Sequence, residues 1–276
     1  MKLNLQVVKM LYIDGIQYHV EVKGKGEPIV LLHGFTGDSS TWNEILPYLE
    51  NYKTIAIDLL GHGSTDSPGD PDRYRIEQAV ADLKVILDEL DIEEVSLLGY
   101  SMGGRIALAF TAAYPERVKA LILESSSPGL KTVSERRLRV SADKKLADMI
   151  LSEGLINFVD YWENIPLFSS QKKLSSSKQE EIRLNRLSQN PVGLANSLKG
   201  MGTGRQPSYW EALRNLPIKM LFITGELDSK FCRIAKEMEN GAQNACIEEI
   251  EGAGHALHVE EPEKFGTIVR EFLKNT

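Results

Sequence analysis

The sequence predicts an α/β fold in which a mostly parallel central sheet is flanked by helices and interrupted by a helical insertion. Short, uninterrupted apolar runs alternate with amphipathic stretches through the first half of the chain, the alternation stops between residues 129 and 208, and it resumes afterwards. Uninterrupted apolar strands are typical of parallel sheets that are covered on both faces. Parallel neighbours require crossover connections, and helices supply these in most α/β folds.

The predicted strands of the first half lie at residues 29–32, 54–57, 95–98 and 121–123. Between the second and third runs, residues 76–90 carry apolar side chains at helical spacing, namely Ile76, Ala79, Val80, Leu83, Ile86, Leu87 and Leu90. A period of 3.6 residues indicates an amphipathic helix. Strands that alternate with helices predict βαβ units.

The second half supplies two more predicted strands, at residues 220–224 and 247–250, and a last helix at 262–274. We assign residues 1–128 and 209–276 to an α/β core and residues 129–208 to a helical lid. An insertion placed after the carboxyl end of a strand covers the edge at which open α/β sheets bind ligands.

Charge is distributed unevenly between these parts. The net charge of −7 argues against a nucleic-acid-binding protein, which usually has a basic excess. Residues 131–205 carry 13 Lys and Arg against 8 Asp and Glu, which leaves 19 basic and 31 acidic residues for the rest of the chain. A basic lid over an acidic body favours a small polyanionic substrate, although surface lysines on solvated helices give the same count.

The remaining bulk features predict a cytoplasmic protein with no stable membrane insertion. Two cysteines, Cys232 and Cys246, are too few for a disulfide framework and are expected to be reduced thiols. The first 15 residues lack the apolar run of a signal peptide, and no stretch approaches the roughly 20 apolar residues of a membrane span. Met10 is an alternative start, because the regular pattern begins after it. The oligomeric state stays open, and a monomer is compatible with these features.

The strongest motif is Gly-Tyr-Ser-Met-Gly at residues 99–103, which fits the G-x-S-x-G pattern of a nucleophile elbow. It follows the predicted strand 95–98 and opens a predicted helix at 104–113. The turn is tight and needs small residues, and the helix N-terminus stabilises negative charge that develops near Ser101. The alternative is a simple tight turn with an exposed serine.

A serine hydroxyl needs a base, and the base needs an orienting carboxylate. Asp228 follows the predicted strand 220–224, and His255 follows the predicted strand 247–250. Both residues therefore lie at carboxyl strand ends, where they can converge on Ser101. We predict a Ser101–His255–Asp228 triad in the chain order that this motif class shows.

Five other polar residues are rivals for these roles or lie near them. His258 is expected to form structural hydrogen bonds, Asp58 precedes the serine and is interpreted as a turn or cap residue, and Glu226 is a weaker rival acid. His33 and His62 are expected to be structural. No H-E-x-x-H motif or Cys/His cluster indicates a metal, so we expect neither a metal nor a cofactor.

An oxyanion hole is expected beside the serine. In folds with this elbow, the loop after the early strand supplies one backbone N–H and the residue after the nucleophile supplies the other. Here these residues are Phe35 and Met102. Such donors contribute roughly 3 kcal/mol each to stabilising the transition state.

Taken together, these motifs indicate the α/β-hydrolase fold, and nearly the whole chain resembles the 2-succinyl-6-hydroxy-2,4-cyclohexadiene-1-carboxylate synthases of menaquinone biosynthesis. The resemblance rests on Tyr-Ser-Met-Gly-Gly-Arg at residues 100–105, Glu-Ser-Ser-Ser-Pro-Gly-Leu at 124–130, Gly-Glu-Leu-Asp-Ser-Lys-Phe at 225–231 and Gly-His-Ala at 254–256. Arg105 lies one turn into the elbow helix, where esterases of the fold commonly carry a small or apolar residue.

The resemblance implies a set of substrate-binding residues, which comprises Arg105, Arg139, Arg186, Trp162 and Tyr100. Arg136 and Arg137 are rivals for the position of Arg139, and Arg183 is a rival for that of Arg186. Arginines bind carboxylates through two parallel hydrogen bonds and stay charged. The alternative for any one lid arginine is a surface charge.

The resemblance also implies a lyase that eliminates pyruvate from 2-succinyl-5-enolpyruvyl-6-hydroxy-3-cyclohexene-1-carboxylate. Ser101, activated by His255, is then expected to act as a base, with Asp228 orienting the histidine. Two other hypotheses remain: a carboxylic-ester hydrolase with Ser101 as covalent nucleophile, and a catalytically inactive binding module on the same fold. Fold alone does not decide between them.

Overall fold

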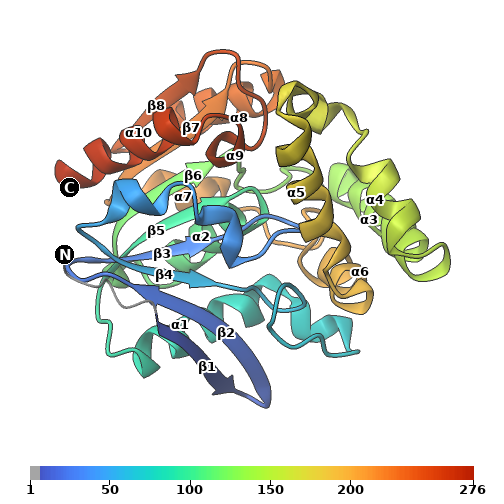
Figure 1. Ribbon diagram of the computed structural model, residues 1–276. Helices are drawn as coiled ribbons and strands as arrows, with labels where there is room; N and C mark the ends of the chain where they lie inside the picture. Colours follow the sequence, from blue (N-terminus) through green and yellow to red (C-terminus); the bar gives the residue numbers. More distant parts are fainter. Residues whose placement is uncertain (1–6) are drawn as a thin grey trace.

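Eight strands form one sheet in the computed structural model, which describes residues 7–276 (Figure 1). Their order across the sheet is β1-β2-β4-β3-β5-β6-β7-β8. The strands are β1 (Val7–Ile13), β2 (Ile16–Lys23), β3 (Pro28–Leu32), β4 (Lys53–Ile57), β5 (Val95–Tyr100), β6 (Val118–Glu124), β7 (Lys219–Gly225) and β8 (Ala245–Ile250). From β4 to β8 all neighbours are parallel, so the predicted mostly parallel sheet is confirmed.

Continuous apolar runs form the central strands because both faces of the sheet are buried. In β3, Val30 and Leu32 join one core cluster, while Ile29 and Leu31 join a second cluster on the opposite face. Successive side chains of a strand point to opposite faces, so burial on both sides requires an apolar residue at every position. Each predicted run lies inside an observed strand.

An N-terminal hairpin was missed by the sequence interpretation. β1 pairs antiparallel with β2, and β2 pairs antiparallel with β4. Val7 to Met10 are already part of strand β1, so the expectation that the regular pattern starts only after Met10 is wrong. In β2 buried and half-buried residues alternate, which a search for continuous apolar runs does not detect. Asp14 and Gly15 both have positive φ, as a two-residue hairpin turn requires.

Helices cover both faces of the sheet. They are α1 (Ile76–Glu89), α2 (Met102–Ala113), α7 (Trp210–Asn215), α8 (Ser229–Gly241), α9 (Leu257–Glu260) and α10 (Pro262–Lys274), with short 3-10 turns η1 (Ser39–Trp42), η2 (Leu46–Leu49), η3 (Pro71–Tyr74) and η4 (Pro115–Arg117). Side chains of α1, α2, α7 and α8 belong to one core cluster. Side chains of η1, η2, α9 and α10 belong to the other. The predicted last helix has the observed bounds of α10.

Four helices and a 3-10 segment lie between β6 and α7 in the sequence, and Figure 1 shows the four helices grouped at one side of the sheet. They are α3 (Val133–Ser152), α4 (Leu155–Trp162), η5 (Pro166–Lys173), α5 (Ser176–Leu187) and α6 (Pro191–Met201). Thr132 and Glu135 form a capping box that starts α3. The group has its own apolar cluster, which includes Ala147, Phe158 and Leu194.

Two further expectations concern the thiols and the membrane. Cys232 and Cys246 are both free. Within residues 7–276, none of the helices combines the length and the apolar character that crossing a bilayer requires.

Candidate active site

Ser101 lies at a sharp turn between β5 and α2. Its φ of 49° is in the left-handed region, which is strained for a residue with a side chain. The Ser101 N–H donates to the Glu124 carbonyl at 2.8 Å, and the Ser126 hydroxyl donates to the Ser101 carbonyl at 2.8 Å. A Cβ on Gly103 would lie 2.1 Å from the Leu32 carbonyl oxygen, so only glycine fits there. The serine is thus held where a strand meets a helix N-terminus.

The structure brings Ser101, His255 and Asp228 together at the carboxyl ends of β5, β8 and β7. Asp228 Oδ2 accepts a hydrogen bond from His255 Nδ1 at 2.6 Å, and His255 Nε2 lies 3.2 Å from Ser101 Oγ. With the Nδ1 proton directed at the carboxylate, Nε2 is free to accept the serine proton. Asp228 and His255 are both buried. This arrangement can move a proton to or from Ser101.

Asp228 is oriented by the helix that follows it. It is the N-cap of α8. Its Oδ1 accepts a hydrogen bond from the Phe231 N–H at 3.3 Å, and its Oδ2 accepts the one from His255 Nδ1. The centre of the Phe231 ring lies 4.7 Å from that of the His255 ring. The ring of Tyr100, the last residue of β5, lies 5.4 Å from the His255 ring. The imidazole therefore sits between aromatic walls that exclude water.

A cavity of about 450 Å³ opens in front of Ser101 and His255. Core and insertion both line it: Phe35 and Met102 lie beside the serine, while Trp162 comes from α4. The Trp162 ring stacks on Phe158 at 5.5 Å and meets Phe35 edge-on at 5.5 Å. Phe35 and Met102, the residues predicted to supply the oxyanion donors, therefore both border this cavity.

Among the side chains that line this cavity are three cations, Arg105 from α2, Arg139 from α3 and Lys230 from α8; Lys131 lines it as well and is paired with Glu237, and Glu135 is a second acidic lining residue. Burial and, to a lesser extent, the charge of Arg139 lower the pKa of Arg105 to about 10. Burial likewise lowers the pKa of Lys230, again with a contribution from Arg139. Cations that repel one another in a partly dry cavity create a site that favours an anion.

Two residues that the sequence interpretation did not single out hold the arginines. Arg105 Nη1 donates to Gln206 Oε1 at 2.5 Å and to the Met201 carbonyl at 2.6 Å. Arg139 Nε donates to Asp143 Oδ1 at 2.7 Å, one helical turn away. Gln206 and Asp143 are buried. The spacing of Arg139 and Asp143 was a readable signal, whereas nothing in the sequence marked Gln206.

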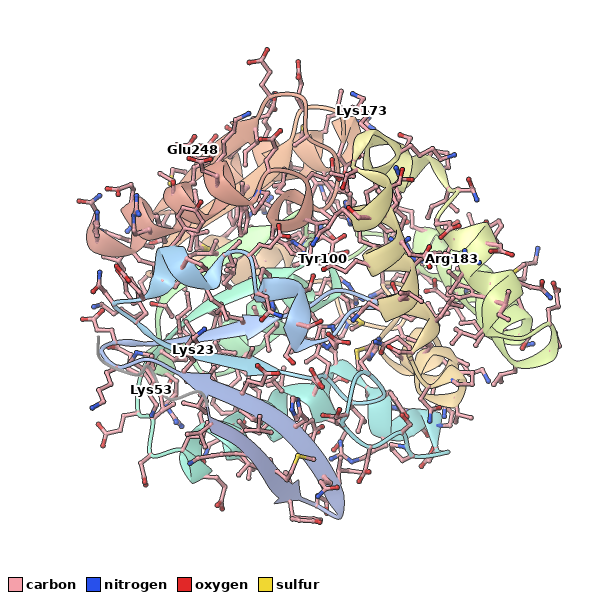
Figure 2. All side chains as sticks on the ribbon, in the orientation of Figure 1. Lys23, Lys53, Tyr100, Lys173, Arg183 and Glu248 are labelled. Carbon is pink, nitrogen blue, oxygen red and sulfur yellow. The ribbon has the colours of Figure 1, made fainter. Side chains whose placement is uncertain are left out.

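The lid arginines do not all face this cavity. Arg139 lines it, and its rivals Arg136 and Arg137 are not among the lining residues. Arg183 pairs with Asp160 at 2.6 Å and with Glu163 at 2.7 Å. Arg186 lines the adjoining cavity, which shares Phe35, Tyr100 and Phe168 with the first, and its contact with substrate stays a prediction. In Figure 2, Tyr100 lies near the centre of the molecule and Arg183 lies among the insertion helices.

The rival histidine, His258, forms a separate buried pair with Glu124. The backbone N–H and the Nδ1 of His258 both contact the Glu124 carboxylate, at 3.1 and 2.8 Å. His258 Nε2 lies 2.7 Å from the Thr41 hydroxyl oxygen. Neither residue contacts Ser101 through its side chain. His258 thus has the structural hydrogen bonds that we expected.

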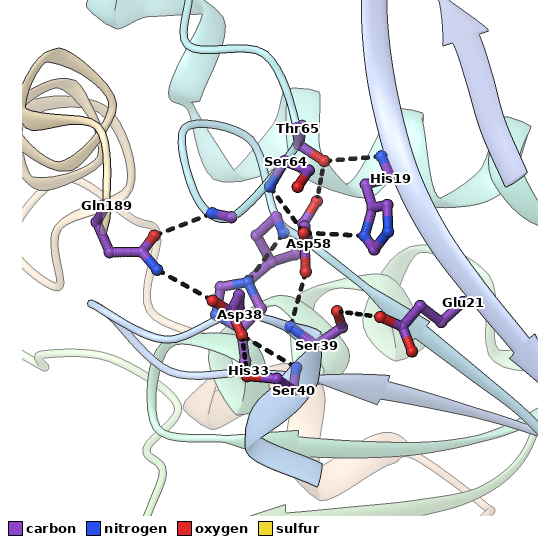
Figure 3. Close-up of polar contacts among 12 residues, drawn as sticks. His19, Glu21, His33, Asp38, Ser39, Ser40, Asp58, Ser64, Thr65 and Gln189 are labelled. Carbon is purple, nitrogen blue, oxygen red and sulfur yellow. Dashed lines mark hydrogen bonds and ion pairs between the residues drawn. The ribbon is translucent and has the colours of Figure 1, made fainter. Parts of the chain in front are cut away.

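Asp58, the rival acid, directly follows β4 and lies in a network of polar contacts (Figure 3). It accepts from the Ser39 N–H at 2.7 Å and the Ser64 N–H at 2.8 Å, and it lies 3.0 Å from His19 Nδ1. Nearby, Gln189 from the insertion contacts Gly63 N–H. Asp58 therefore stabilises turns, as expected.

Glu226 and the two remaining histidines also have structural partners. Glu226 accepts from the Gly252 N–H at 2.9 Å. His33 Nε2 accepts from the Leu59 N–H at 2.9 Å, and His62 Nδ1 lies 3.2 Å from the Leu60 carbonyl. Burial lowers the pKa of both histidines, that of His62 to about 3. Across residues 7–276, no cluster of three His, Cys, Asp or Glu side chains is suited to hold a metal ion.

Comparison with known proteins agrees with this geometry. The family model of the alpha/beta hydrolase fold matches residues 27–262. A Bacillus subtilis (strain 168) protein, provisionally named 2-succinyl-6-hydroxy-2,4-cyclohexadiene-1-carboxylate synthase, is 50% identical over 96% of this chain and 98% of its own. The synthase of that name from Enterobacter sp. (strain 638) is 30% identical over 89% of this chain and 91% of its own.

Solved structures give the same result. MenH from S. aureus superimposes with a TM-score of 0.89 at 37% identity, covering 93% of this chain and 98% of its own. A thermophilic esterase from Thermogutta terrifontis has a TM-score of 0.83 at 26% identity, covering 98% of each chain. The chain belongs to the α/β-hydrolase fold family and, within it, to the 2-succinyl-6-hydroxy-2,4-cyclohexadiene-1-carboxylate synthases.

Proposed function

We propose that this protein eliminates pyruvate from 2-succinyl-5-enolpyruvyl-6-hydroxy-3-cyclohexene-1-carboxylate, yielding 2-succinyl-6-hydroxy-2,4-cyclohexadiene-1-carboxylate for menaquinone synthesis. The names of its close relatives support the reaction. The observation that carries the proposal in this chain is the cavity itself. It joins a proton-transfer triad to Arg105, Arg139 and Lys230, and so suits a substrate with several carboxylates.

The triad acts by proton transfer in this proposal. His255 Nε2 takes the Ser101 proton, and Ser101 Oγ takes the proton beside the succinyl ketone. The electron pair of that C–H bond forms a new ring C=C bond, the electron pair of the existing ring C=C bond shifts one carbon toward the leaving group to form the second, and the C–O bond to the enolpyruvyl group breaks. The leaving enolpyruvate takes the proton from His255 and tautomerises to pyruvate. Each residue therefore returns to its starting protonation state.

Asp228 and the backbone amides support this transfer. Asp228 fixes the His255 tautomer through the 2.6 Å hydrogen bond and stabilises the imidazolium while it carries the proton. The amides of Phe35 and Met102 stabilise the enolate oxygen or the Ser101 alkoxide. Fixed dipoles in a dry site need no reorganisation during the reaction, so they stabilise the charge that develops in the transition state effectively.

Arg105 and Arg139 orient the substrate by its carboxylates. Arg105 donates to neutral partners only, the Gln206 amide oxygen and the Met201 carbonyl, so its charge remains available to a ligand. Trp162 and Tyr100 supply apolar walls against the ring of the substrate. Holding the reacting carbon close to Ser101 lowers the entropic barrier to proton transfer.

We propose residues 129–208 as the lid over this site. Trp162, Phe168 and Arg139 support this assignment, because all three come from this segment and line the cavity with Ser101. We also propose that the enzyme works in the cytoplasm. The free thiols of Cys232 and Cys246 are typical of a reducing compartment.

Pyruvate release from the pathway intermediate tests the function. The purified protein is given the enolpyruvyl substrate, and pyruvate is measured through NADH oxidation by lactate dehydrogenase. Wild type should turn over, and Ser101→Ala should lose about 10³-fold or more of kcat. Turnover by Ser101→Ala at a near-native rate would overturn the mechanism, and absence of pyruvate with wild type would overturn the function.

Ester hydrolysis is the second candidate, because the strained Ser101 elbow also suits a covalent nucleophile and an esterase shares the fold. The same preparation is tested on neutral p-nitrophenyl esters. Hydrolysis that exceeds pyruvate release and is unaffected by Arg105→Ala would favour the esterase. Loss of pyruvate release in Arg105→Ala, with weak ester hydrolysis in wild type, would favour the lyase.

A further inference from the structure

Three segments that are far apart in the sequence are joined by hydrogen bonds beside the loop that is expected to supply an oxyanion donor. This oxyanion loop, residues 33–39, follows β3. The other two segments are the loop after β4, residues 58–65, and the C-terminal end of α5 with the residues after it, 185–189 (Figure 3). Asp58 joins the two core loops, because it accepts from the Ser39 N–H at 2.7 Å and the Ser64 N–H at 2.8 Å.

Asp38 connects the oxyanion loop to the lid with one carboxylate oxygen and caps a 3-10 turn with the other. Its Oδ2 accepts from Asn185 Nδ2 at 2.7 Å and from Gln189 Nε2 at 3.2 Å. Its Oδ1 accepts from the Ser40 N–H at 3.0 Å and the Ser40 hydroxyl at 2.5 Å, so Asp38 is also the N-cap of η1. Burial alone would raise the pKa of Asp38, but the hydrogen bonds from Ser40 and Asn185 lower it below its usual value, so the carboxylate is ionised.

Gln189 binds the lid to both core loops. It is only 3% exposed, its Nε2 donates to Asp38, and its Oε1 accepts from the Gly63 N–H at 2.9 Å. Both polar ends of its amide are thus bound to the core, so the side chain cannot turn over without breaking a hydrogen bond. We call Asp38, Asn185 and Gln189 the clamp.

The helix α5 depends on polar contacts of this kind because it offers the core little apolar surface. Among residues 176–187 only Arg186 is buried. The apolar clusters on the two faces of the sheet, as far as the structure describes them, contain none of the α5 side chains. Leu187 packs against the apolar cluster of the lid itself, and Lys178 pairs with Glu44 near the surface. Loss of the clamp should therefore loosen α5 from the core.

The oxyanion loop contacts the lid a second time through Phe35. The Phe35 ring meets Trp162 edge-on at 5.5 Å and Phe158 at 6.2 Å, and both partners come from α4. Asp38 follows Phe35 by three residues. Lid contacts at Phe35 and Asp38 therefore act on the short stretch of backbone that carries the expected oxyanion donor.

We propose that Asp38 is a positioning residue for the reaction, which holds the oxyanion loop against the lid so that the Phe35 N–H keeps its place beside Ser101. A donor of this kind acts on charge that develops in the transition state, so its displacement lowers kcat more than it raises KM. The inference rests on the proposed function, because that function gives the Phe35 amide its role.

Asp38→Asn separates the clamp from the cap. Asparagine is as good an N-cap as aspartate, so the amide oxygen can keep the hydrogen bonds from Ser40. The new NH₂ group then faces the NH₂ groups of Asn185 and Gln189, where three donors have no acceptor among them. Adding Asn185→Asp reverses the polarity of the pair, because the new amide can donate to the new carboxylate.

Asp70→Asn is the matched control. Asp70 is the N-cap of η3, another 3-10 turn of the core, and it accepts from the Asp72 N–H at 3.0 Å. Pyruvate release and the hydrogen exchange of the α5 amides are measured on the full chain, at a temperature where every variant is folded.

Asp38→Asn should lower kcat by about 10-fold or more, which is part of the loss of about 10²–10³-fold that follows removal of an oxyanion donor. It should also speed hydrogen exchange in α5. The double variant with Asn185→Asp should recover most of the kcat and of the protection from exchange, and Asp70→Asn should match wild type in both.

A native kcat in Asp38→Asn, a rise in KM alone, or a double variant as slow as Asp38→Asn would overturn the proposal, because a cap or a merely structural contact gives these results. Failure of the proposed function is a different outcome, since wild type itself would then release no pyruvate.

Discussion

Glu124 links the elbow to the segment that carries His255, and its replacement tests how the site is held. It is fully buried at the end of β6. Its carbonyl accepts from the Ser101 N–H at 2.8 Å, while its carboxylate accepts from the backbone N–H and the Nδ1 of His258 at 3.1 and 2.8 Å. His258 is in turn bound to the Thr41 hydroxyl at 2.7 Å.

We expect Glu124→Ala to destabilise the protein by about 3–5 kcal/mol, because it removes one partner of a buried pair. In a chain of this size, 1 kcal/mol lowers Tm by roughly 2–4 °C, so Tm should fall by about 6–20 °C. Glu124→Gln should cost only about 1 kcal/mol. Its amide N–H can donate to His258 Nδ1 if the ring proton moves to Nε2, which then donates to Thr41.

Urea unfolding of wild type and both variants measures the stability difference, with Thr41→Val as the matched control for the outer hydrogen bond. Pyruvate release is measured at a temperature where every variant is folded. A shift of about 1 Å between Ser101 and His255 can lower the rate by about 10²-fold, so folded Glu124→Ala should lose about that much kcat. Equal stability of the Ala and Gln variants, or native kcat in the folded Ala variant, would refute the reasoning.

Three further predictions concern other parts of the site. Asp143→Ala should raise KM by about 10-fold or more with little change in kcat, because Arg139 loses a charge-assisted hydrogen bond of about 1.5–3 kcal/mol. Asp143→Asn should retain most of the affinity. Steady-state kinetics measures both constants, and a fall in kcat in place of the rise in KM would contradict this prediction. His62 has a pKa of about 3 in the fold against 6.5 when free, so the unfolded chain binds the proton first and stability falls as pH drops from 6.5 toward 3, by up to about 1.4 kcal/mol per pH unit. His62→Phe should therefore lose less stability between pH 7 and 5 in urea unfolding, and an unchanged pH slope would contradict this. Gly103→Ala should prevent the elbow from forming, because its Cβ would lie 2.1 Å from a backbone oxygen; a folded, active Gly103→Ala enzyme would contradict it.

The parallel core and the convergence of the triad could be predicted from the sequence for one reason. Continuous apolar runs mark strands that are buried on both faces, and the carboxyl ends of parallel strands meet at the same edge of the sheet. Ser101, Asp228 and His255 each follow such a run. Their proximity follows from the topology, so no knowledge of side-chain packing was needed.

The N-terminal hairpin could not be predicted from the same signal. β2 lies near the edge of the sheet, and its residues alternate between buried and half-buried positions. β1 is the edge strand and is mostly exposed. Alternating and exposed strands have no continuous apolar run, although the Asp14–Gly15 turn was a readable sign of a hairpin.

The sequence by itself determined the parallel part of the sheet, the elbow and the three strand ends that carry Ser101, Asp228 and His255. Only the tertiary structure decided that Arg139 enters the active-site cavity while Arg186 enters its neighbour, and that Asp143 and Gln206 hold the arginines. Strand order fixes where backbone ends lie, but the direction of a long side chain depends on how its helix is rotated and packed against the rest of the molecule. That rotation is set by contacts between residues far apart in the chain, which local spacing does not encode.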